Sequence, residues 1–121
     1  MQAKEANKCL SPDIEFQDGV IHIQGRSIQD YPNQEFERLI NAFLYYSISP
    51  LQNTEINICL EYINSSTNRL LMNLFVIAES IKEKGFQVTV NWYYELHDEL
   101  MLDQGNIFKS LINIPFIFIE A

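Results

Sequence analysis

Three consecutive hydroxyl side chains, Ser65, Ser66 and Thr67, follow Asn64 at the point where an apolar run ends. Hydroxyls are the groups that protein kinases modify, and a phosphate adds a charge of about −2 to the surface that a partner meets. Asparagine and serine are also common at the start of a helix, where Asn64 or Ser65 can cap unpaired backbone N–H groups and contribute about 1 kcal/mol. From the residues alone, capping is the favoured interpretation, and phosphorylation of one hydroxyl is the alternative.

The other reactive side chains do not form a recognisable catalytic set. Glu95, His97, Asp98 and Asp103 are potential metal ligands, but their spacing matches neither a zinc nor a calcium pattern, and a solvated acidic helix start is favoured. Neither His22 nor His97 lies in a context that marks a general base, and there is no nucleophile elbow or phosphate-binding glycine loop. We therefore predict no catalytic residue, metal or cofactor. The rival hypotheses are a small metal-dependent enzyme that uses those four side chains and a structural oligomerisation domain in which Ser65 is only a cap.

A strand on one side and a helix on the other must position the four polar residues. Apolar residues between Leu70 and Ile81 recur at three- and four-residue spacing, which predicts a long amphipathic helix from about Ser66 to Lys84. The apolar run Thr54–Ile63 predicts a strand before it. Asn64–Thr67 are thus expected at a helix N-terminus, where unpaired N–H groups carry the positive end of the helix dipole.

The rest of the chain has the pattern of alternating strands and helices. The Asp18-Gly19 pair between two alternating runs predicts a tight hairpin. The order of two strands, helix, strand, helix, strand, short helix and strand predicts an α/β fold, in which a mixed sheet of about five strands is packed by two main helices and a short third. The remaining elements are expected at Ile14–Phe16, at Val20–Ile23, from Asn33 to the residue before Pro50, at Phe86–Tyr94, within 95–105, with 106–112 irregular or helical, and at Pro115–Glu120.

Chain length and hydrophobic content indicate one domain. With 121 residues, 47% of them hydrophobic, the chain has enough apolar material for one compact core. We expect residues 1–10 to form a flexible N-terminal arm and residues 11–121 to form the single α/β domain. The strand Thr54–Ile63 is apolar on both sides of its alternation, which predicts burial on more than one face.

The charge balance disfavours some classes of partner. Eight basic and sixteen acidic residues give a net charge of −8, which disfavours binding to nucleic acid and to anionic membranes. No apolar run is long enough to span a membrane, and the first residues lack the apolar core of a secretion signal. Cys9 and Cys59 are the only cysteines, and we expect reduced thiols in a soluble cytoplasmic protein.

Several short segments, spread over nearly the whole chain, form the pattern of a known family. They are Ile23–Ser27, Leu60–Thr67, Val90–Glu95, Asp98-Glu99 and Gly105. The strongest are the strand-to-helix Asn-Ser-Ser and the Val-Asn-Trp-Tyr-Tyr run, and Ser11-Pro12 and Pro115-Phe116 resemble the two ends of the pattern. In these segments the chain resembles the SiaC family of bacterial regulatory phosphoproteins.

The resemblance implies an α/β fold similar to that of anti-sigma-factor antagonists, here called STAS-like, and a partner-switching role. In such a family a dedicated protein kinase phosphorylates the protein and a PP2C-type phosphatase reverses the modification. In the best-known branch, the unphosphorylated form binds and activates a diguanylate cyclase, which places it in cyclic di-GMP signalling. The acceptor of the family is a threonine whose position is occupied here by Ser65, with Ser66 and Thr67 as alternatives. The residues expected to bind partners are Asn64, Ser65, Ser66, Thr67, Arg69, Arg26, Ser27, Tyr93 and Tyr94.

Overall fold

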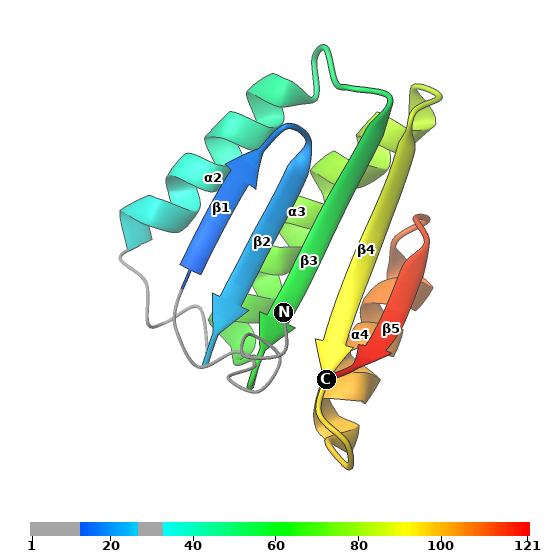
Figure 1. Cartoon of the computed structure of the whole chain (residues 1–121). Coiled ribbons are helices and arrows are strands. Elements are labelled where there is room, and N and C mark those ends of the chain that lie inside the picture. The colour runs from blue at the N-terminus through cyan, green and yellow to red at the C-terminus, as the bar shows by residue number, and fades with distance from the viewer. Residues whose placement is uncertain (1–12, 27–32) are drawn as a thin grey trace.

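The computed structural model describes residues 13–26 and 33–121 of the chain (Figure 1). Strands and helices alternate after an N-terminal hairpin, as the sequence predicted. The expected residues 1–10 arm lies outside the described residues. The elements are β1 (Asp13–Gln17), β2 (Val20–Gly25), α2 (Asn33–Tyr46), β3 (Asn53–Leu60), α3 (Ser65–Glu83), β4 (Gln87–Tyr94), α4 (Glu99–Leu111) and β5 (Phe116–Glu120).

The five strands form one mixed sheet whose spatial order is the order of the chain, β1-β2-β3-β4-β5. β1 pairs with β2 in antiparallel register, and β2, β3, β4 and β5 are parallel to one another. Asp18 and Gly19 both have positive φ, 55° and 79°, so the predicted Asp-Gly hairpin is confirmed. Positive φ at both central residues is typical of the tight turns that match the twist of a hairpin.

The helices of the described residues, α2, α3 and α4, cover the same face of the sheet (Figure 1). Each crossover leads to the next strand in the same direction, and crossovers of one hand then place every helix on one side. The expectation that Thr54–Ile63 is buried on more than one face holds in part. Ile56 and Ile58 are buried under the helices, and Asn57 on the opposite face is only 3% exposed, whereas Glu55 on that face is exposed. The strand also ends earlier, at Leu60.

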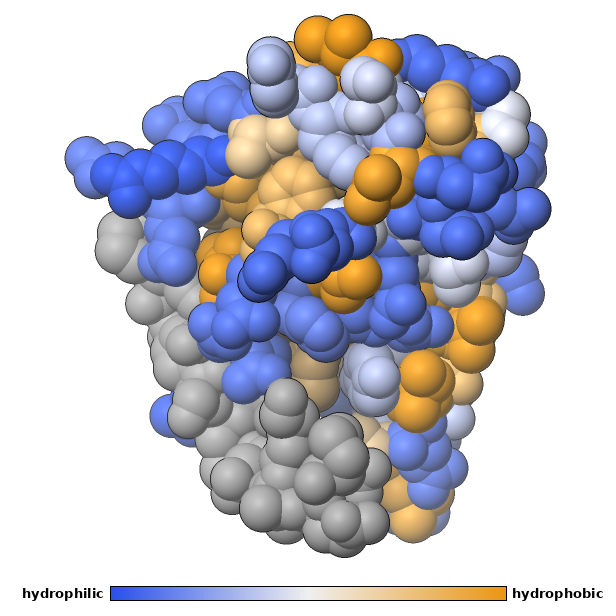
Figure 2. Space-filling model, turned by 45° about the horizontal axis from the view of Figure 1, so that its top comes forward, coloured by the Kyte–Doolittle hydropathy of each residue, from blue (hydrophilic) through white to orange (hydrophobic). Residues whose placement is uncertain are grey.

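The face of the sheet opposite α2, α3 and α4 is mainly polar. Figure 2 looks obliquely onto this face and the loop end above it, and hydrophilic residues cover most of the view with separate hydrophobic groups between them. At its centre, the Asn91 side-chain amide donates to Asn57 Oδ1 over 2.8 Å and to Glu55 Oε2 over 3.2 Å. Asn57 in turn donates to the carbonyl oxygen of Ile21 over 3.3 Å, so the face is held by side-chain hydrogen bonds.

Cys59 lies near the end of β3 and is half-buried. It is disulfide-bonded, so the expectation of a reduced thiol at this position is wrong. The spacing of cysteines along the chain does not reveal whether a thiol is oxidised in the folded protein. Cys9, the other cysteine of the sequence, lies outside the described residues.

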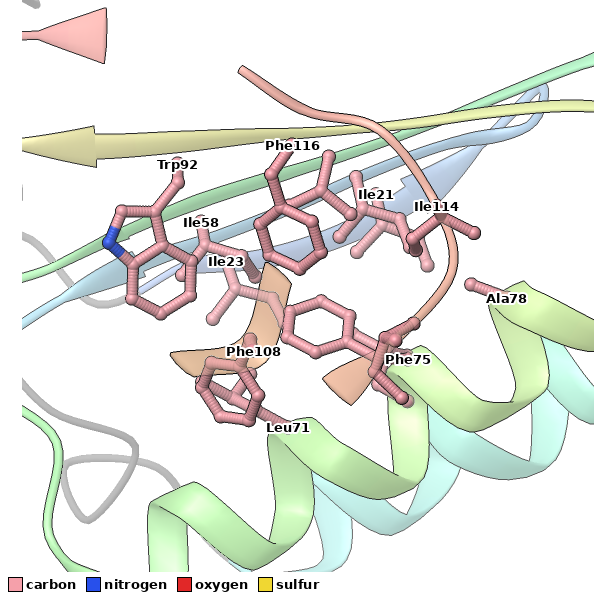
Figure 3. Close-up of a cluster of buried hydrophobic side chains, with 14 of the residues drawn as sticks. Ile21, Ile23, Ile58, Leu71, Phe75, Ala78, Trp92, Phe108, Ile114 and Phe116 are labelled. Carbon is pink, nitrogen blue, oxygen red and sulfur yellow. The ribbon is translucent and has the colours of Figure 1, made fainter. Parts of the chain in front are cut away.

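The core lies between the helices and the sheet (Figure 3). Phe75 of α3 makes edge-to-face contacts with Phe108 of α4, at 5.0 Å between ring centroids, and with Phe116 of β5, at 5.3 Å. Trp92 of β4 is fully buried, and its ring lies 5.6 Å from that of Phe108. The aromatic cluster therefore joins α3, α4, β4 and β5 into one packed unit.

Helix α4 packs unusually close to the sheet at Gly105. A Cβ atom at this residue would lie 2.6 Å from Phe118 Cε1 and 2.7 Å from Trp92 Cδ1 and Nε1. The Trp92 indole N–H also donates to the carbonyl oxygen of Met101 over 2.9 Å. Gly105 thus permits close approach in the middle of a helix instead of ending one. α4 continues to Leu111, so of the segment 106–112, which was expected to be irregular or helical, residues 106–111 are helical.

Candidate functional site

The predicted site lies at the sheet edge where the parallel strands end. Figure 1 shows the arrowheads of β2, β3 and β4 at this edge, and the N-terminal ends of α3 and α4 lie there too. Connections at the carboxyl ends of parallel strands are where α/β proteins usually place their binding residues. The four-residue connection from β3 to α3 ends with Asn64, directly before the helix.

Asn64 caps α3 and leaves the two serines free. Its Oδ1 accepts a hydrogen bond from the backbone N–H of Thr67 over 2.8 Å, and its backbone is extended, as is typical of an N-cap. Ser65 and Ser66 are the first two helical residues, and both side chains are exposed. Their backbone N–H groups have no intrahelical acceptor in α-helical geometry. Of the two capping residues considered from the sequence, the structure selects Asn64.

Thr67 differs from the two serines in its environment. Its side chain is only 1% exposed, and its hydroxyl oxygen has no hydrogen-bond partner in the described part of the structure. A modifying enzyme cannot reach this oxygen unless the first turn of α3 opens. Burial thus separates the three hydroxyls, leaving Ser65 and Ser66 accessible.

Removing the cap should destabilise the protein modestly. We expect Asn64→Ala to lower the free energy of unfolding by about 1 kcal/mol, because the N–H of Thr67 loses its acceptor in a partly buried turn. Urea denaturation followed by circular dichroism measures the change. Asn73→Ala is the matched control, since Asn73 is exposed on the same helix. Asn64→Asp retains an accepting oxygen, so an equal loss with Asn64→Asp would contradict the capping role.

The two predicted arginines have different surroundings. Arg26 follows β2, and its Nε lies 3.6 Å from Glu61 Oε1, with the side chains 69% and 31% exposed. Its carbonyl oxygen accepts from the N–H groups of Glu61 and Tyr62 over 3.1 and 3.0 Å, which ties the ends of β2 and β3 together. Arg69 is exposed one helical turn beyond Ser65, and the described residues offer it no ion pair. Ser27 lies outside the described residues.

Tyr93 and Tyr94 lie at the same edge, on opposite sides of the end of β4. They line a cleft of about 260 Å³ that also reaches Glu61 and Asp98. The backbone N–H of Ala121 donates to the carbonyl oxygen of Tyr94 over 2.8 Å. The structure therefore brings Arg26, the start of α3 and the two tyrosines to one edge.

A second cleft at this edge contains Asp98 and Asp103 together with apolar residues that the sequence analysis did not select. This cleft lies between the connection that leads into α3 and the first part of α4, is called the α3–α4 cleft here, and has a volume of about 320 Å³. The sequence contained a signal for this cleft. Leu100 and Ile107 are apolar, lie seven residues apart on one helix, and do not belong to the buried stripe of that helix. The cleft is lined by Glu61, Tyr62, Ile63, Asp98, Leu100, Met101, Asp103, Gln104 and Ile107.

The residues of the rival metal hypothesis do not come together as a ligand set. Within residues 13–26 and 33–121, no group of three or more His, Cys, Asp or Glu side chains is arranged to hold a metal ion. Asp98 instead caps α4, because its Oδ1 accepts from the N–H of Met101 over 3.1 Å. No helix in the described part of the chain is long and apolar enough to cross a membrane.

Comparisons with known proteins agree with this architecture. The model of the SiaC family, described as regulatory phosphoproteins, matches residues 4–121. An uncharacterized protein of Pseudomonas aeruginosa (strain UCBPP-PA14) is 25% identical over 108 residues, which cover 84% of this chain and 81% of that protein.

Two solved structures from Pseudomonas aeruginosa have the same fold. The structure of the diguanylate cyclase SiaD in complex with its activator SiaC contains a chain that superposes with a TM-score of 0.80 at 20% identity, with 93% of this chain and 94% of that chain covered. Apo-SiaC superposes with a TM-score of 0.74 at 22% identity, with 93% of each chain covered. The predicted α/β class with a mixed five-stranded sheet is confirmed.

Proposed function

We propose that this chain, which belongs to the SiaC family of regulatory phosphoproteins as its motifs predicted, is a non-catalytic signalling switch modified at Ser65. SiaC of Pseudomonas aeruginosa is the activator of the diguanylate cyclase SiaD. By analogy, the unphosphorylated form of this chain binds and regulates an output protein, and a diguanylate cyclase is the first candidate. The observation that carries the proposal is that Ser65 is exposed at the start of α3 while Asn64 supplies the cap.

Ser65 is the preferred acceptor among the three hydroxyls. Burial argues against Thr67, whose side chain is 1% exposed. Ser66 is as accessible as Ser65 and stays the alternative, because the preference for Ser65 depends on its position in the family motif. Since Asn64 caps the helix, modification of Ser65 leaves the capping hydrogen bond in place.

The switch would operate through local electrostatics. A phosphate on Ser65 lies beside the unpaired N–H groups of the first helical turn, which accommodate an anion. The first turn of α3 contains no acidic residue that would repel it. The added charge repels carboxylates of the output protein and draws the nearby Arg69 away from them, while it attracts an Arg-lined site in another partner.

The proposed partners are proteins. They are a cognate protein kinase, a PP2C-type phosphatase and the output protein, all in the cytoplasm. A net charge of −8 argues against nucleic acid and anionic membranes as partners.

Phosphorylation mapping tests the acceptor. The protein is incubated with ATP and a protein kinase encoded beside it, and the modified residue is identified by mass spectrometry. We expect one phosphate, on Ser65, because this hydroxyl is exposed at the helix start. Ser65→Ala should abolish incorporation.

Ser66→Ala is the matched control and should be modified as fast as the wild-type protein. Phosphate on Ser66 or Thr67 would move the acceptor within the same turn. Phosphate outside residues 65–67 would contradict the proposed site.

A further inference from the structure

The α3–α4 cleft combines a buried apolar floor with exposed apolar walls. Met101 is buried at its base and Ile63 is half-buried beside it. Leu100 and Ile107 stand on the α4 wall with 80% and 51% of their side chains exposed, and Tyr62 is 50% exposed on the other side. Large apolar side chains around a hollow are typical of a contact surface. The volume of about 320 Å³ has room for side chains of a partner.

The rim of the cleft is acidic. Glu61, Asp98 and Asp103 line it, and its lining includes no lysine, arginine or histidine. Glu61 forms an ion pair with Arg26, and Asp98 accepts the hydrogen bond that caps α4. Asp103 is exposed and forms no ion pair with a residue that the structure describes. An incoming segment with positive charge would therefore be attracted to this rim.

We propose that the α3–α4 cleft docks an amphipathic helical segment of a partner protein, with apolar side chains in the cleft and Lys or Arg side chains facing the acidic rim. Leu100 and Ile107 are two turns apart on α4, so they present apolar contacts at the spacing that a second helix can pack against. The inference rests on the proposed function, because it assigns a binding surface to one of the partner proteins of the phosphorylation switch.

The charge of this cleft also indicates which partner it suits. Ile63 lines the cleft and Ser65 follows two residues later, so a phosphate on Ser65 would add negative charge beside the acidic rim. A basic segment would then bind the phosphorylated form at least as tightly as the unmodified form. This behaviour suits the protein that removes the phosphate, whereas an output protein that dissociates on phosphorylation must depend on other contacts, such as Arg69.

The test uses the unmodified full chain and a pair of synthetic helical peptides. One peptide has leucines on one face and lysines beside them, and its twin has glutamates in place of the lysines. Calorimetric titration should give at least about tenfold tighter binding for the lysine peptide, a difference that shrinks as salt rises. Equal affinities for the two peptides would overturn the inference.

Matched substitutions locate the binding surface. Ile107→Ser should weaken binding of the lysine peptide about tenfold, and Val76→Ser should leave it unchanged, although each side chain is 51% exposed on the outside of a helix. Asp103→Lys should weaken it about fivefold, and Glu83→Lys on α3 should have a smaller effect. Circular dichroism checks that each variant is folded. Equal effects within either pair would show that the peptide binds without the cleft.

A final comparison separates this inference from the proposed function. Protein made with phosphoserine at residue 65 should bind the lysine peptide about two- to fivefold more tightly than the unmodified protein. A fall in affinity would contradict the charge argument. The peptide results on the unmodified chain do not depend on any kinase, so failure of a kinase to modify Ser65 would remove the proposed switch and leave the docking surface standing.

Discussion

Phosphoserine at residue 65 should lower the affinity of the output protein about ten- to hundredfold, and Ser65→Ala should leave the affinity unchanged. Ser65 is exposed and its hydroxyl is not needed for the cap, so alanine alters neither the helix start nor the surface charge. A phosphate adds about −1.5 to −2 charges, and like charges brought together in an interface cost several kcal/mol. Each 1.4 kcal/mol corresponds to a factor of about ten in affinity.

Charge-matched variants make the measurement specific to the start of α3. Ser65→Asp adds one charge at the site, so we expect a smaller loss of affinity than phosphoserine gives. Ser110→Asp adds the same charge at an exposed serine near the end of α4, at the opposite edge of the sheet. Binding to the diguanylate cyclase encoded nearest to this chain, measured by calorimetry, should be unaffected by Ser110→Asp. Equal losses for both aspartate variants would show that overall charge, and not the site, governs binding.

Trp92→Ala should lower the free energy of unfolding by about 3–5 kcal/mol, the cost of emptying a large aromatic site in a core. Trp92 is fully buried, contacts the rings of Phe108 and Phe116, and donates its indole N–H to Met101. Its removal leaves a cavity beneath α4 and takes one hydrogen-bond donor away from the Met101 carbonyl oxygen. Urea denaturation followed by circular dichroism measures the loss.

Two further variants divide the contribution of Trp92. Trp92→Phe keeps a ring in the core but removes the donor to the Met101 carbonyl, so we expect a loss between those of wild type and Trp92→Ala. Tyr93→Ala changes the next residue, which is half-buried and points to the other side of the sheet, and should cost less than Trp92→Ala. A loss below about 1.5 kcal/mol for Trp92→Ala would contradict a rigidly packed aromatic cluster.

Local patterns in the sequence predicted most of the fold. The Asp18-Gly19 pair between alternating runs predicted the hairpin, and the spacing of apolar residues from Leu70 to Ile81 predicted α3. The prediction left residues 106–112 open as irregular or helical, and the structure continues α4 to Leu111 through the closely packed Gly105. Its contact with Trp92 and Phe118 comes from elements distant in the chain, and no local rule contains it.

The position of the candidate site could be predicted from the sequence, but the roles of its individual residues could not. The polar residues at the start of α3 were found because they interrupt an apolar pattern. Which of them cap, which are exposed and which are buried depended on the packing of the first helical turn, and only the structure distinguishes Thr67 from Ser65. The α3–α4 cleft was missed because Tyr62 and Leu100 lie far apart in the sequence and line the same cleft only in the folded protein.

The order of the strands in the sheet has a consequence for how the chain folds during synthesis. Each strand pairs only with the strand before it and the strand after it, so the sheet can grow by one strand at a time as the ribosome releases the chain. Each parallel pair nevertheless joins residues 26 to 35 positions apart in the sequence, and such non-local pairing slows folding. The last strand, β5, contributes Phe116, which contacts Phe75 and Trp92. The aromatic core thus stays open until synthesis reaches β5, and a chain halted before that point would expose it to chaperones and proteases.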